Sequence, residues 1–62
     1  MDVLISSRGI ETSYANAGSV RAAVKRFRTV HKDDVIDAVY IFDSTNNTPE
    51  SRVKVEDWEN AE

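Results

Sequence analysis

The sequence predicts an α+β domain in the order strand, helix, strand, strand (β-α-β-β), in which one amphipathic helix packs on a small three-stranded sheet. Two kinds of observation support this fold class. Apolar residues recur at helical spacing through the middle of the chain. Short apolar runs that are typical of strands lie at residues 3–6, 35–42 and 51–56. Because the chain has 62 residues, we expect a single small domain over 1–62, with a frayed tail over 58–62.

The first expected strand, residues 3–6, is followed by a turn at residues 7–9, where Ser, Arg and Gly end the apolar run. A turn that leads toward a helix can bind an anion through its backbone N–H groups. Residues 6–9 lack the spaced glycines of a phosphate loop, however. The sequence therefore predicts an ordinary turn here.

The helix is predicted from its apolar stripe. Val20, Val24 and Phe27 fall within one narrow arc of a helical wheel, and the pattern continues to residue 32. His31 is the only histidine and lies on the same arc near the C-terminal end of the helix. In that position a packing or capping role is favoured over that of a general base.

The start of this helix is open to two interpretations. Thr12 or Ser13 could cap a long helix that runs on through Gly18. Alternatively, Ser19 is the N-cap and residues 14–18 form a loop. A glycine inside a helix costs only about 1 kcal/mol relative to alanine, so Gly18 does not decide between them. We adopt the longer helix, which begins near Ser13, as the prediction.

A basic ridge follows the helix beside the apolar stripe. Arg21, Lys25, Arg28 and Lys32 have the spacing i, i+4, i+7 and i+11, and no Asp or Glu occurs between residues 12 and 32. The ridge therefore has no acidic partner within its own helix. Its four cations could bind an anion or the phosphates of a nucleic acid. The low isoelectric point and the lack of aromatic residues interleaved with the basic ones argue against nucleic acid.

The net charge of −3 hides an asymmetry between the two halves of the chain. Six basic and two acidic residues give residues 1–32 a charge of +4, whereas two basic and nine acidic residues give residues 33–62 a charge of −7. We expect the two halves to neutralise each other in the fold. Acids of the C-terminal half would then approach the basic ridge; the candidates are Glu56, Asp57 and Glu59.

Residues 35–42 carry the strongest strand pattern, and both faces of this strand are largely apolar. One helix covers one face of a small sheet, so the other face is left to contact a partner. Alternation leaves two sets of candidate protein-interaction residues, depending on which face the helix covers. The first set contains Val39 and Ile41, and the second contains Tyr40 and Phe42.

The last strand is expected at residues 51–56, where Val53 and Val55 alternate with polar residues and should point inward. Residues 43–50 are rich in turn formers and predict a long hairpin loop. Asp43 begins a pattern that resembles a calcium loop, but the sixth position is not glycine and the twelfth is not glutamate.

Several function classes are disfavoured by composition. The chain has no cysteine, which excludes a disulfide, a thiolate metal site and a cysteine nucleophile. Nothing marks a catalytic nucleophile, so we expect no enzymatic activity, no cofactor and no bound metal. The apolar runs are too short for a membrane span or a signal peptide, which favours a cytoplasmic protein without a membrane partner.

These observations lead to two hypotheses. The first is a small non-enzymatic interaction or regulatory module that binds either a protein partner or itself, the latter as a homodimer, through an apolar sheet face. The second is a regulator that binds nucleic acid through the basic ridge.

Overall fold

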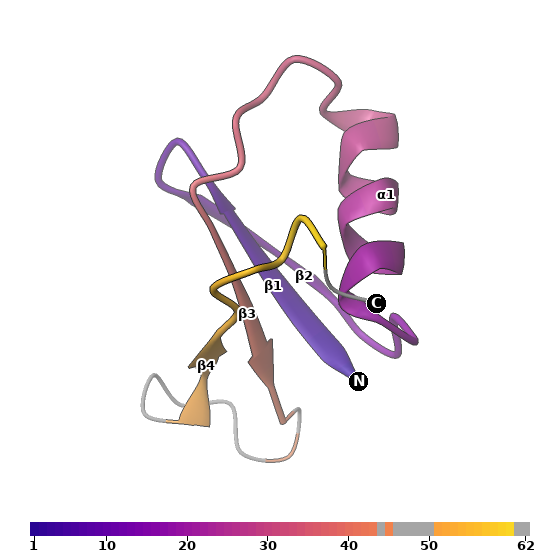
Figure 1. Cartoon of the computed structure of the whole chain (residues 1–62), viewed down its shortest axis with the longest axis vertical. Coiled ribbons are helices and arrows are strands. Elements are labelled where there is room, and N and C mark those ends of the chain that lie inside the picture. Colours follow the sequence, from indigo (N-terminus) through magenta and orange to yellow (C-terminus); the bar gives the residue numbers. More distant parts are fainter. Residues whose placement is uncertain (44, 46–50, 61–62) are drawn as a thin grey trace.

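The computed structural model describes residues 1–43, 45 and 51–60. Its elements follow the order β1 (Asp2–Ser7), β2 (Ile10–Tyr14), α1 (Val20–Val30), β3 (Ala38–Phe42) and β4 (Val53–Lys54). The strands form one antiparallel sheet in the order β2-β1-β3-β4, and α1 lies against one of its faces (Figure 1). The protein is therefore a mixed α+β domain, as the sequence predicts. The predicted three strands and β-α-β-β order are wrong in detail, because the sheet has a fourth strand, β2.

The additional strand forms a hairpin with β1. Ser7 pairs with Ile10, and between them Arg8 and Gly9 have φ angles of +52° and +80°. Two successive residues with positive φ form the two-residue turn that best matches the twist of an antiparallel hairpin. The Arg8 N–H also donates to the Asp37 carboxylate at 2.8 Å, which ties this turn to the segment before β3.

The helix begins later than residue 13 because the backbone before it is not helical. Asn16 and Gly18 have φ angles of +55° and +85°, in the left-handed region that a right-handed helix excludes. Ser19 has an extended backbone, and its hydroxyl oxygen accepts a hydrogen bond from the Ala22 N–H at 3.0 Å. Ser19 is therefore the N-cap. The alternative with Ser19 as the N-cap is confirmed, and the prediction of a longer helix from Ser13 is wrong.

The helix ends at Val30, two residues before the predicted end. The His31 N–H still donates to the Phe27 carbonyl at 2.8 Å, but the backbone of His31 has left the helical region. The imidazole stacks on the Phe27 ring with 4.6 Å between centroids, and its Nδ1 lies 3.1 Å from the Asp34 carboxylate. His31 thus both packs and caps, as expected, and Lys32 lies outside the helix.

The core lies between α1 and the central strands β1 and β3. The predicted stripe is confirmed, because Val20, Val24 and Phe27 are each at most 7% exposed. They pack together with Ala23 against the sheet, where Val3, Ile5 and Val39 are fully buried. Burying each large apolar side chain contributes about 1.5–3 kcal/mol. Because Val39 belongs to this core, α1 covers the face of β3 that carries Val39 and Ile41.

Strand β3 is shorter than the predicted strand over residues 35–42. The segment before it still follows β1, since the Ser7 hydroxyl donates to the Val35 carbonyl at 2.7 Å. The Asp37 N–H likewise donates to the Ser6 carbonyl at 2.8 Å. These bonds do not continue the regular ladder, so regular pairing starts at Ala38.

Strand β4 is reduced to two residues at the edge of the sheet. Val55 packs against the core, as predicted, but Val53 is 63% exposed. Val53 pairs with Ile41 and so shares the helix-facing side, yet it lies beyond the reach of the single helix. Much of the predicted loop over residues 43–50 lies outside the described residues.

Candidate functional site

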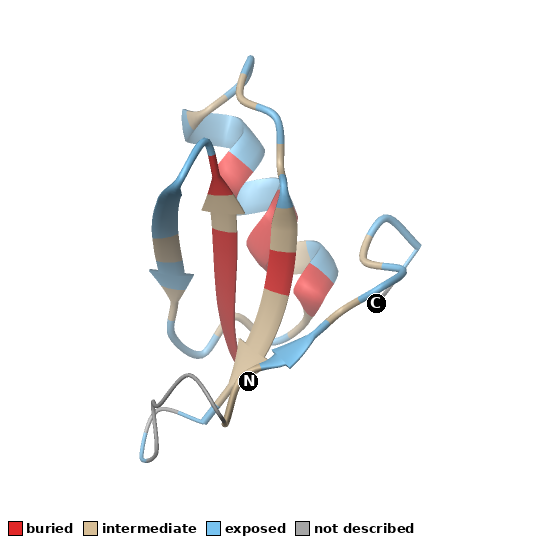
Figure 2. Ribbon diagram, turned by 90° about the vertical axis from the view of Figure 1, so that its left-hand side faces the viewer, coloured by how far each residue is buried: buried red, intermediate tan, exposed pale blue. Residues whose placement is uncertain are grey.

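One face of the sheet is not covered by any element of the described residues (Figure 2). Leu4 pairs with Tyr40, and Asp2 pairs with Phe42, so these side chains share a face. Strand alternation places this face opposite the one that carries Val39. We call Leu4, Ala38, Tyr40 and Phe42 the open sheet face.

The four sequence-predicted interaction residues are thus divided between the two faces. Tyr40 and Phe42 are half-buried and lie on the open sheet face. Val39 is 0% exposed beneath α1, and Ile41 packs against the same core. Val39 therefore cannot reach a partner in this fold without displacing the helix, whereas Ile41 is only partly buried.

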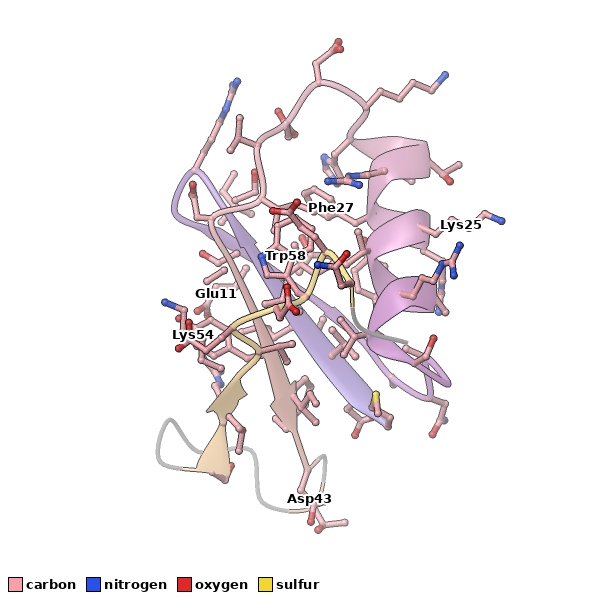
Figure 3. The ribbon with its side chains drawn as sticks, viewed as in Figure 1. Glu11, Lys25, Phe27, Asp43, Lys54 and Trp58 are labelled. Atoms are coloured by element: carbon pink, nitrogen blue, oxygen red, sulfur yellow. The ribbon has the colours of Figure 1, made fainter. Side chains whose placement is uncertain are left out.

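An ion pair crosses the open sheet face. The Arg52 guanidinium donates to the Glu11 carboxylate at 3.4 Å, which joins the residue next to β4 to the opposite edge strand, β2. Strands β3 and β1 lie between β4 and β2 in the sheet, so this ion pair spans the face on which Leu4 is 5% exposed. Arg52 Nε is buried without a hydrogen-bond partner among the described residues. Glu11 and Lys54 both project on this side of the sheet in Figure 3.

A groove of about 510 Å³ lies between α1 and the C-terminal segment, and we call it the helix–tail groove. This volume is typical of small-ligand sites, which measure about 300–1,000 Å³. The C-terminal segment leaves β4 and turns back toward α1, which brings residues far apart in the sequence together (Figure 1). The lining residues are Arg21, Val24, Lys25, Arg28, Thr29, Trp58 and Glu59.

Trp58 links the C-terminal segment to the basic ridge. Its side chain packs against the core, and the Arg28 guanidinium carbon lies 5.5 Å from the centre of its ring. Such a cation–π contact contributes about 0.5–1 kcal/mol at an exposed site. Figure 3 places Trp58 between the sheet and α1, with Lys25 projecting outward from the helix. Sequence reasoning left Trp58 out of the site because it stood in the expected tail.

The structure separates Lys32 from the rest of the basic ridge. Arg21, Lys25 and Arg28 line the helix–tail groove, whereas Lys32 does not. The i+11 spacing assumed a helix that continued to residue 32, but α1 ends at Val30. The ridge on the helix therefore consists of three cations.

None of the three groove cations forms an ion pair within the part of the chain that the structure describes. The described ion pairs are Arg8–Asp34, His31–Asp34 and Arg52–Glu11. Of the C-terminal acids expected to approach the ridge, Glu59 lines the groove without pairing, and Glu56 and Asp57 are not part of its lining. Within the described residues, Glu59 therefore lies near the ridge, but none of these three acids forms an ion pair with it.

The fourth basic residue of the helix lies on another side. The Arg26 guanidinium carbon is 5.1 Å from the centre of the Tyr14 ring. Burial raises the pKa of the Tyr14 hydroxyl above its usual value, and the charge of Arg26 partly opposes this rise. The contact joins α1 to the end of β2.

Among residues 1–43, 45 and 51–60, no cluster of three or more His, Asp or Glu side chains is placed to hold a metal ion.

Asp43 accepts hydrogen bonds from the N–H and hydroxyl of Thr45 at 2.9 and 2.8 Å, which lowers the pKa of its carboxyl. In the same described ranges, no helix is long and apolar enough to cross a bilayer.

Comparison with known proteins returned no match to any family model, curated protein or solved structure.

Proposed function

We propose that the protein is a non-enzymatic interaction module that binds through its open sheet face, and that the occupant of this face is a second copy of the chain. The observation that carries the proposal is the position of Tyr40 and Phe42 on a face over which no described element packs. Contiguous apolar surface of this kind usually marks a contact with another protein. A small domain also has a thin core, and association buries more apolar surface.

The charges around the open sheet face favour a second copy as the occupant. Glu11 on the β2 edge already pairs with Arg52 within the chain, so Lys54 on β4 is the charge of these three that has no ion pair among the described residues. A two-fold axis parallel to the strands would place β4 of each copy over β2 of the other and bring each Lys54 toward the edge that carries the partner's acidic residue. An axis perpendicular to the strands would place β4 over β4 and bring like charges together. Lys54 is available for such a contact, since it forms no ion pair within the described ranges.

The size of the open sheet face sets the expected strength of the dimer. Three strands of about five residues and the two-residue β4, about 4.8 Å apart and with about 3.3 Å per residue, make a face of roughly 270 Å². A standard interface removes about 800 Å² from water on each partner. We therefore expect a weak, rapidly exchanging dimer with a dissociation constant in the high micromolar range.

Sedimentation velocity over protein concentrations from about 10 µM to about 1 mM tests this proposal. The sedimentation coefficient should rise with concentration in the native protein. Tyr40→Lys should stay monomeric throughout, with a circular dichroism spectrum that shows it is folded. The control is Val53→Lys, which adds the same charge at a 63% exposed position on the other side of the sheet and should leave association unchanged.

A native protein that stays monomeric over the whole range would refute the dimer. So would a Val53→Lys variant that loses association as completely as Tyr40→Lys, because the contact would then depend on overall charge rather than on the open sheet face.

A further inference from the structure

The helix–tail groove gathers three cations that have no acidic partner among the described residues. Arg21, Lys25 and Arg28 occupy positions i, i+4 and i+7 of α1, so they spread over about 10 Å along the helix axis. Glu59 is the one described acid in the lining, and no ion pair joins it to any of them. Neighbouring cations on a helix repel one another. An anion bound along this row would relieve that repulsion.

Trp58 gives the same groove a planar, apolar wall. The indole packs against the core, which restrains it, and the Arg28 guanidinium lies 5.5 Å from the ring centre. Bases of single-stranded nucleic acids are recognised by stacking on aromatic rings and on arginine guanidinium planes. The Trp58–Arg28 pair therefore offers a stacking surface beside two cations that can meet phosphates.

We propose that the helix–tail groove binds single-stranded nucleic acid, with one base stacked on the Trp58–Arg28 pair and the adjacent phosphates on Arg21 and Lys25. The volume of about 510 Å³ accommodates a ligand of that size. A duplex keeps its bases paired and cannot offer one to the groove. A free mononucleotide offers a base, but its phosphates form one cluster, whereas the cations are spread along the helix.

This inference does not depend on the proposed dimer. The groove lies on the helix side of the sheet, and the open sheet face is on the opposite side. It also revises the argument from sequence, in which the lack of an aromatic residue near the ridge counted against nucleic acid. The fold brings Trp58 to the ridge from the far end of the chain.

The number of cations sets the expected salt dependence. Neutralising the two phosphates that contact Arg21 and Lys25 gives a slope of about −1.4 for log affinity against log salt concentration. Raising the salt from about 50 mM to about 200 mM should therefore weaken binding about seven-fold. The net charge of −3 opposes long-range attraction of a polyanion, so we expect only micromolar affinity at low salt.

Intrinsic fluorescence provides a direct test, because Trp58 is the only tryptophan in the chain. Titration of the full protein with a short uridine oligonucleotide should quench this fluorescence saturably, and added salt should reverse the quenching. Lys25→Gln should weaken binding about five-fold and halve the salt slope to about −0.7, since one of the two phosphate contacts is lost. Lys32→Gln is the matched control. It makes the same change just outside the groove and should leave the affinity and the salt slope unaltered.

Two competitors distinguish the sources of the ligand. ATP represents the free mononucleotide, and a blunt DNA duplex represents phosphates without accessible bases. Both should compete at least ten-fold less well than the oligonucleotide at equal phosphate concentration. Absence of quenching, equal effects of Lys25→Gln and Lys32→Gln, or equal competition by ATP or duplex would each overturn the proposal.

Discussion

Replacing Phe27 by alanine removes the side chain that joins the helix to the sheet. Phe27 is 2% exposed, is among the largest fully buried side chains, and stacks on His31 at 4.6 Å. Truncation of such a buried phenylalanine costs about 3–5 kcal/mol, because apolar contact is lost and a cavity remains. A domain of this length has a total stability of about 3–9 kcal/mol. The variant should therefore lose a third or more of its stability, and at the lower limit it should not fold.

Urea unfolding followed by circular dichroism measures this loss. Val30→Ala is the control, since it also shortens an apolar side chain of α1 but at a position that is 74% exposed. The control should change the unfolding free energy by no more than about 0.5 kcal/mol. If Phe27→Ala lost less than about 1 kcal/mol, or no more than the control, the assignment of the buried helix face would be wrong.

Three further predictions concern the helix cap, the half-buried Tyr14 and the hairpin turn. Ser19→Ala should lower the unfolding free energy by about 1 kcal/mol in urea titrations, because the Ala22 N–H loses its acceptor, and Ser19→Asp should restore most of it. Burial raises the pKa of the Tyr14 hydroxyl in the folded state, so the protonated phenol stabilises the fold fully below the usual tyrosine pKa near 10. This contribution is lost as the pH rises through the higher pKa of the folded state. Tyr14→Phe should therefore reduce the drop in the urea midpoint that the native protein shows at alkaline pH. Arg8→Asn should raise the thermal midpoint, with a gain of about 0.5–1 kcal/mol, because asparagine accepts the φ of +52° at this turn position more readily; a lower midpoint would show that the 3.8 Å contact with Asp34 matters more.

The helix stripe and the first strand could be predicted from sequence because each has a regular local pattern. The start of the helix could not, because residues 10–18 fitted either a helix or a loop, and the strand over residues 10–14 was missed. Ile10, Thr12 and Tyr14 alternate as a strand should, but Thr12 and Ser13 also resemble a helix cap. Pairing with β1 decided the matter, and that contact is not visible in the local sequence.

The sequence also could not determine which face of β3 stays open, because the answer again depends on contacts between distant segments. Both faces of β3 are apolar, so periodicity gave two sets of candidates without choosing between them. Packing of α1 on Val39 made the choice and left Tyr40 on the open sheet face.

The basic ridge was visible in the spacing of its residues, but the groove was not. The groove exists because the chain turns back after β4 and lays Trp58 beside Arg28. A tryptophan near the end of a small domain is a signal that such a segment packs, since so large an apolar ring is seldom left wholly in water.

A dilution series of amide NMR spectra tests the central claim most directly, because it locates the contact surface residue by residue in the native protein. Between about 1 mM and about 20 µM, we predict concentration-dependent shifts at Leu4, Tyr40 and Phe42 on the open sheet face, and none at the Trp58 indole in the groove. Spectra that do not change with concentration, or shifts confined to the helix side of the sheet, would contradict association through the open sheet face.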